Sequence, residues 1–102
     1  MAVDKGSFLS ERVLNTGVFV ERSSSIVCTF DVSTSGWNTS NEVDVPQVNG
    51  LNVIGFTVYA RSSYKVYSVM PSYNSSTHKV QCGGYISGTG TYTVTLYPLY
   101  AK

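Results

Sequence analysis

The sequence predicts an all-β protein, an antiparallel β-sandwich of the jelly-roll or Ig-like kind with a short N-terminal arm. Two observations support this prediction. Larger apolar residues alternate with small or polar ones along almost every segment, which is the period of a strand with one buried face. Clusters of Gly, Asn, Ser and Thr separate these segments at short intervals, as in sandwiches of about seven strands. An up-and-down barrel is the alternative fold.

The chain of 102 residues is expected to form one domain with one hydrophobic core. We divide it into an N-terminal arm or attachment segment, residues 1–16, and a sandwich domain, residues 17–102. Within the arm, the run SFLSERVL at residues 7–14 could form a short helix, which is stable in water only if it docks on something. A frayed terminus is the other interpretation.

The strands are expected at residues 17–22, 25–33, 42–46, 51–61, 64–70, 78–83 and 91–100. Their even-numbered positions carry most of the larger apolar side chains, which predicts a core of Val20, Ile26, Phe30, Val32, Ile54, Phe56, Val58, Val80, Val94 and Leu96. Residues 33–41, 72–77 and 83–90 are expected to form turns, as is Asn49-Gly50, where both residues tolerate positive φ. Pro98 lacks the N–H of a central strand and therefore places the last strand near a sheet edge.

The sequence offers little chemistry for an enzyme. Its single histidine, His78, follows a polar turn and is interpreted as a surface residue. Glu42 and Asp44 have the spacing of a carboxylate pair, but solvated charges that block strand addition explain them more simply. Cys28 and Cys82 alternate with core residues, so both are expected to be buried, free and not bound to metal. We therefore expect a non-enzymatic protein with no cofactor and no metal.

The distribution of charged and apolar residues argues against nucleic acid and membrane as partners. The net charge is +1 and the basic residues are scattered, so a nucleic-acid interface is not expected. The N-terminal residues lack the apolar run of a signal peptide, and no stretch is apolar enough for membrane insertion. The sequence thus predicts synthesis in a cytoplasm, where thiols stay reduced.

Eight tyrosines and one tryptophan are many for a chain of this length. Alternation points Tyr59, Tyr67 and Tyr97 away from the core, and it places Trp37 and Tyr73 in or beside loops. Tyrosine and tryptophan suit a protein interface or a sugar-stacking platform, so these five residues are the candidate binding or interface residues. Tyrosines also stabilise a solvated sheet face without any ligand, which is the structural alternative.

The second half of the chain resembles the small C-terminal β domains of bacteriophage and prophage tail fibres and related virion-surface proteins. The resemblance lies in the order of GLNVIGFTVYARSS, YSVMPSYNSST, HKVQCGGYISGTG and the final strand TYTVTLYPLY. It implies a virion component made in the host cytoplasm, commonly trimeric, that contacts other virion proteins or a glycan of the host surface. Fibre proteins are usually long, so this short chain is either a fibre tip or a small decoration protein.

We therefore expect a non-enzymatic structural and binding protein of a bacteriophage virion. The alternative is a carbohydrate-binding, lectin-like module, which could act as a monomer and would use Trp37, Tyr59, Tyr67 and Tyr73 for stacking.

Overall fold

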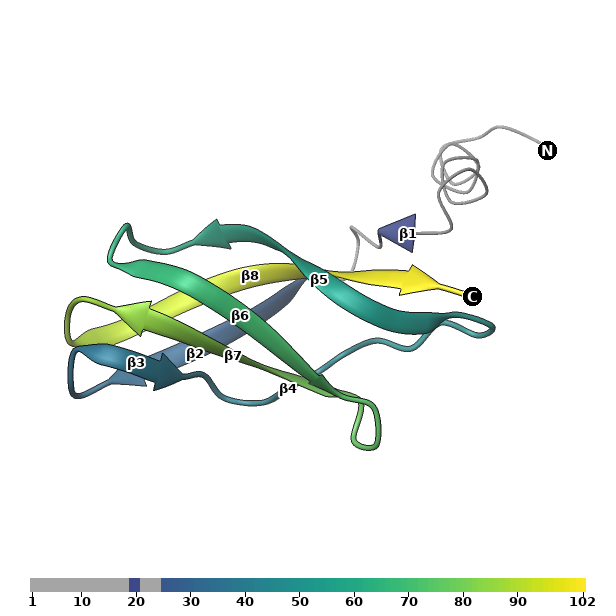
Figure 1. Ribbon diagram of the computed structural model, residues 1–102, viewed down its shortest axis with the longest axis horizontal. Coiled ribbons are helices and arrows are strands. Elements are labelled where there is room, and N and C mark those ends of the chain that lie inside the picture. The colour runs from purple at the N-terminus through teal and green to yellow at the C-terminus, as the bar shows by residue number, and fades with distance from the viewer. Residues whose placement is uncertain (1–18, 21–24) are drawn as a thin grey trace.

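The computed structural model describes residues 19–20 and 25–102, and within this part of the chain it is all-β (Figure 1). The eight strands are β1 (Phe19–Val20), β2 (Ile26–Val32), β3 (Gly36–Thr39), β4 (Val43–Asp44), β5 (Asn52–Arg61), β6 (Val66–Asn74), β7 (Lys79–Ile86) and β8 (Gly90–Ala101). They form two antiparallel sheets packed together, which confirms the predicted all-β sandwich. The predicted arm at residues 1–16 and its helix lie outside the residues whose structure is described, and of Val20 only the backbone is described.

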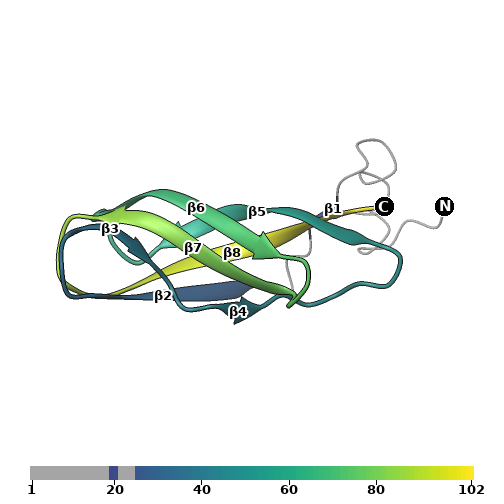
Figure 2. The ribbon, with the colours of Figure 1, turned by 60° about the horizontal axis from the view of Figure 1, so that its bottom comes forward.

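Each sheet is built around one long central strand. In sheet A, β8 pairs with β1 and β2 along one side and with β5 along the other. In sheet B, β7 pairs with β3 and β4 on one side and with β6 on the other. Because β7 and β8 are consecutive, one short connection, residues 87–89, joins the central strands of the two facing sheets, which Figure 2 shows from the side of sheet B. The sheets remain separate, so the chain does not form the barrel considered as the alternative.

The core lies between β2 and β8 on one side and β7 on the other. Most of the predicted core is buried as expected: Ile26, Phe30, Val32, Val80, Val94 and Leu96. Phe56 is partly buried and packs against this cluster. Cys28 and Cys82 are fully buried and form no disulfide, which confirms the predicted burial of both thiols.

The predicted burial of Ile54 and Val58 is wrong. Ile54 is 54% exposed and Val58 is 38% exposed. The register between β5 and β8 shifts between Val53 and Gly55 and again between Val58 and Ala60, so β5 carries two bulges. A bulge adds one residue and exchanges the faces on either side of it. Val53 therefore takes the inward position that strict alternation assigned to Ile54. Val58 pairs with the buried Leu96 and keeps its inward position, but it lines an open hollow between β5 and β6 and is therefore partly exposed.

Two segments that were expected to be turns are strands. Residues 36–39 form β3, and β7 continues through Gly83-Gly84 to Ile86. The glycines disguise the alternation of β7, in which Val80, Cys82 and Ile86 face the core. Tyr73, which was placed in or beside a loop, also lies in a strand.

The expectation that Pro98 marks an edge strand is wrong as well, because β8 is the centre of sheet A. Pro98 pairs with Phe56 of β5, while the registers with β1 and β2 end at Leu99 and Leu96, on either side of the proline. On the side of β8 that pairs with β1 and β2, Pro98 lies in the gap between these two strands. The missing N–H therefore leaves no strand hydrogen bond unmade there, and a central strand can accommodate the proline.

Candidate binding face

Three aromatic side chains form a row across the outer face of sheet B. Trp37 of β3 and Tyr67 of β6 both pair with Tyr85 of β7, one from each side. Directly opposed residues of neighbouring strands project from the same face, and here that face points away from the core. The exposed fractions are 56% for Trp37, 42% for Tyr67 and 43% for Tyr85. The Tyr67 and Tyr85 rings lie 5.1 Å apart between centroids at an interplanar angle of 34°.

Gly83 allows the indole of Trp37 to approach the backbone of β7 closely. A Cβ atom at Gly83 would lie 2.3 Å from Cζ2 of Trp37, so the ring occupies the place where a side chain would stand. This contact buries Gly83, although its position in β7 faces outward. Aromatic residues that cover a strand glycine in this way restore part of the packing that glycine lacks.

An open hollow of about 360 Å³ lies beside the indole. Its lining includes Trp37, Gly83 and Met70, with Thr39, Ser72 and Gln81 as polar neighbours. Met70 pairs with Gly83 from the side of β6 and is one of the most exposed apolar side chains of the described residues. We call Trp37, Tyr67, Met70, Gly83 and Tyr85 the aromatic face.

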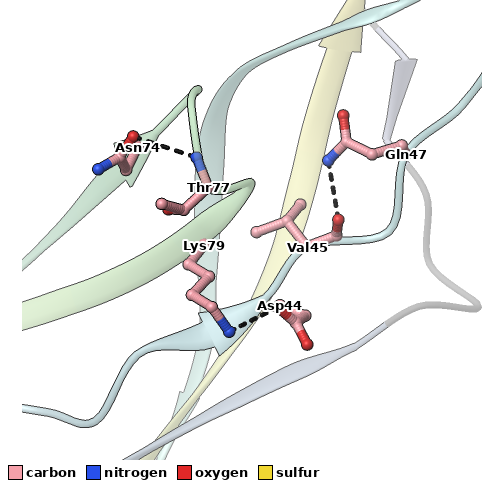
Figure 3. A network of polar contacts seen from close by, with 6 residues as sticks. All are labelled: Asp44, Val45, Gln47, Asn74, Thr77 and Lys79. Carbon is pink, nitrogen blue, oxygen red and sulfur yellow. Dashed lines mark hydrogen bonds and ion pairs between the residues drawn. The ribbon is translucent and has the colours of Figure 1, made fainter.

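An ion pair lies at the end of β7 that is farther from Tyr85 (Figure 3). Nζ of Lys79 pairs with Oδ1 of Asp44 at 2.8 Å, joining β7 to β4. The hydrogen bond to Asp44 raises the pKa of Lys79. At the same end, Asn74 Oδ1 accepts a hydrogen bond from the Thr77 N–H in the turn that leads to β7, and the Gln47 amide donates to the Val45 carbonyl. The side chains of the aromatic face are themselves uncharged, although Lys65, in the turn before β6, lies at the same end of sheet B as Tyr67 and Tyr85.

The predicted site residues divide into three groups. Trp37 and Tyr67 belong to the aromatic face. Tyr59 and Tyr97 lie on sheet A, where their rings meet edge to face at 5.0 Å between centroids. Tyr73 points inward: its ring packs against Phe56 at 5.9 Å, and its hydroxyl accepts a hydrogen bond of 3.2 Å from Gln47 Nε2. A single flat contact cannot cover both sheet A and the outer face of sheet B.

Sequence analysis missed Tyr85, Met70 and Gly83. The sequence does contain a signal for Tyr85. Val80, Cys82 and Ile86 keep the alternation of a strand across Gly83-Gly84, and this alternation places Tyr85 on the outer face. The signal for Met70 was hidden by a bulge in β6, where the register with β7 shifts between Tyr67 and Met70 and Ser68 has a positive φ of 55°. Alternation from Val66 therefore assigns Met70 to the wrong face.

A second hollow, of about 370 Å³, lies where the bulges of β5 and β6 face each other. It is lined by residues 58–61 of β5 and by Ser68 and Val69 of β6. The Arg61 guanidinium beside it donates a hydrogen bond of 2.8 Å to the Val66 carbonyl, so this side chain helps to hold the two edge strands together.

The described residues also bear on other classes of site. Within them, no three His, Cys, Asp or Glu side chains gather closely enough to hold a metal ion. His78 is exposed in the turn between β6 and β7, away from the aromatic face. None of the described residues forms a helix with the length and apolar character needed to cross a bilayer.

Comparison of the chain with protein-family models, with curated proteins and with solved structures found no match.

Proposed function

We propose that the protein is a non-enzymatic structural and binding protein of a bacteriophage virion, either a tail-fibre tip or a surface decoration protein. In this proposal the aromatic face is its principal contact surface. The observation that carries the proposal is the row of Trp37, Tyr85 and Tyr67, which three neighbouring strands hold on the outer face of sheet B. Fixed aromatic rings lose little side-chain entropy when a partner covers them, which is why interfaces are rich in them.

The size of the aromatic face favours assembly of several copies. Covering the exposed half of three aromatic rings would remove roughly 300 Å² from water, since such a side chain buries ~150–250 Å² in full. At ~25 cal/mol per Å² this contributes about 7 kcal/mol, which is comparable with the ~4–15 kcal/mol cost of association. One aromatic face alone thus gives weak binding. Repeated contacts in a homo-oligomer, with a trimer favoured, or in a virion lattice would make the binding strong.

The chemistry around the aromatic face supports binding rather than catalysis. The side chains of the aromatic face and of the hollow beside it are aromatic, thioether, amide and hydroxyl groups, and none of them is a general base at neutral pH. Two free buried thiols also agree with synthesis in a reducing host cytoplasm before incorporation into a virion.

A carbohydrate-binding module is the second candidate, and the hollow beside Trp37 favours it. A flat indole offers a stacking surface for the apolar face of a sugar ring, and Thr39, Ser72 and Gln81 could hydrogen-bond the sugar hydroxyls. The lack of charged groups among these residues suits a neutral glycan.

Light scattering coupled to size-exclusion chromatography, combined with a glycan array, tests both candidates. The virion proposal predicts a stable oligomer that Tyr85→Ser weakens. Tyr64→Ser is the matched control, because Tyr64 is 86% exposed in the turn between β5 and β6 and belongs to neither aromatic cluster. A monomer that binds neutral glycans through Trp37 would replace the virion proposal with the module. A monomer without any glycan binding would refute both.

A further inference from the structure

Two consecutive residues in the connection between β3 and β4 tie one edge of sheet A to sheet B. Ser40 binds Cys82 of β7 twice: its N–H donates to the Cys82 carbonyl at 2.8 Å, and its hydroxyl accepts from the Cys82 N–H at 2.9 Å. Asn41 binds Thr29 of β2 twice: its N–H donates to the Thr29 carbonyl at 3.1 Å, and its side-chain oxygen accepts from the Thr29 N–H at 2.8 Å. Consecutive Cα atoms lie only about 3.8 Å apart. This tie therefore holds Cys82 close to Thr29, the neighbour of Cys28.

Both thiols point into the space that this tie closes. Cys28 and Cys82 have no exposed surface, and they belong to facing sheets. The Cys82 thiol makes a hydrogen bond with the Cys28 sulfur, and this contact is the main cause that lowers the pKa of Cys28 to about 7. The same contact, together with burial, raises the pKa of Cys82. The sequence alternation placed both cysteines on core faces, but it could not show that they touch.

We propose that Cys28 and Cys82 are a paired oxidation site, and that a hydroperoxide converts them into a disulfide that locks sheet A to sheet B. This inference concerns the stability of the sandwich and is independent of the partner that covers the aromatic face. The disulfide would join β2 to β7, beside the hydrogen bonds of Ser40 and Asn41. It would close the loop from residue 28 to residue 82, which contains β3, β4, β5 and β6.

The reaction proceeds in two balanced steps. The Cys28 thiolate attacks one oxygen of hydrogen peroxide, the O–O bond breaks, and Cys28 sulfenic acid and hydroxide form. The Cys82 sulfur then attacks the sulfenic sulfur and forms the S–S bond, while the sulfenic oxygen leaves as water after taking the Cys82 proton. The hydroxide takes up the proton that Cys28 released when it ionised. In total, two thiols and one hydrogen peroxide give one disulfide and two waters.

The first test treats the folded, reduced protein with hydrogen peroxide and measures its intact mass and its non-reduced peptide map. The expected result is a single chain whose mass has fallen by two hydrogen atoms, with the Cys28 and Cys82 peptides linked. The oxidised protein should unfold at a higher urea concentration than the reduced protein. Recovery of two free thiols, of a sulfinic acid at Cys28, or of a disulfide-linked dimer would overturn the inference.

Single alanine variants assign the two roles, because each keeps one thiol and needs no new polar group in the core. With Cys82→Ala, the reaction is expected to stop at a sulfenic acid on Cys28, which dimedone traps. With Cys28→Ala, Cys82 should gain no dimedone adduct. Trapping on Cys82 instead would refute the assignment of Cys28 as the attacking thiol.

An equilibrium measurement tests whether the folded protein favours the disulfide, independently of how fast an oxidant reaches the buried thiols. Reduced protein is incubated in a glutathione redox buffer, once under native conditions and once in concentrated urea, and the linked fraction is measured in each. If the fold holds the thiols ready to bond, folding raises the equilibrium constant for the disulfide, by roughly a thousand-fold at the chain-entropy limit for a loop of this size. A constant in the folded protein that equals or falls below the constant in urea would show that the fold opposes the bond, and would refute the proposal.

Discussion

Replacing Gly83 with alanine is the sharpest perturbation of the aromatic face. The new Cβ atom would lie 2.3 Å from Cζ2 of Trp37, far inside van der Waals contact, so the indole must leave the surface of β7. Trp37 is 56% exposed when it lies on Gly83, which leaves about 100 Å² of the indole covered. At ~25 cal/mol per Å², complete detachment costs up to ~2.5 kcal/mol. The lower chain entropy of unfolded alanine offsets ~0.4–1 kcal/mol of this loss.

We therefore expect Gly83→Ala to lower the free energy of unfolding by about 1.5–2 kcal/mol if the indole detaches fully. Urea unfolding followed by circular dichroism measures this change. The chain has one tryptophan, so its fluorescence reports on the same contact, and the emission of the folded variant should shift to longer wavelength. Gly55→Ala is the matched control: it also changes a strand glycine, but the nearest atom to its new Cβ is Leu99 Cδ1 at 3.8 Å, an ordinary contact.

A double-mutant cycle with Trp37→Ala isolates the contact between the indole and Gly83. Once the indole is absent, Gly83→Ala should be neutral or slightly stabilising. If Gly83→Ala leaves both the emission and the stability of the parent unchanged, the indole does not depend on the glycine and the reasoning fails.

Four further substitutions test the core and the register. Tyr100→Phe removes the hydrogen bond that the buried Tyr100 hydroxyl donates to the Pro46 carbonyl, so urea unfolding should show a loss of about 1 kcal/mol; no loss would mean that the bond contributes nothing. Ile54→Thr should change stability by less than ~0.5 kcal/mol, whereas Val53→Thr should cost more than ~1 kcal/mol because it places a hydroxyl against the core. The reverse order would refute the bulge in β5. Phe30→Ala should cost ~3–5 kcal/mol, and a smaller loss would indicate that the core collapses around the missing ring.

The sequence was most informative where a strand runs without bulges. In β2 and β8, burial alternates strictly over the paired residues, so Ile26, Phe30, Val94 and Leu96 were assigned to the core from their positions alone. In a regular strand each residue faces the opposite side from its neighbours, so the position of one buried residue assigns the face of all the others.

Alternation predicted the wrong face where a strand has a bulge. It also missed a strand that forms only because it pairs with a neighbouring strand. Gly55, next to Ile54, is the kind of residue at which strands bulge, but no residue near Ser68 gives such a signal. The short strand of Trp37 has no apolar alternation of its own, and it exists because Trp37, Asn38 and Thr39 pair with β7. The aromatic face shares this limitation: its members come from three strands, and only the pairing of those strands brings them together.

The accessibility of Trp37 in the assembled protein tests most directly whether the aromatic face is the contact surface. Acrylamide quenching of its fluorescence is measured across a dilution series, and light scattering gives the oligomeric state of the same samples. The account predicts that quenching falls as the oligomer forms, that Tyr85→Ser weakens both changes together, and that Tyr64→Ser leaves both as in the parent. An oligomer in which Trp37 stays as accessible to acrylamide as in the monomer, or a protein that remains monomeric throughout the series, would contradict assembly through the aromatic face.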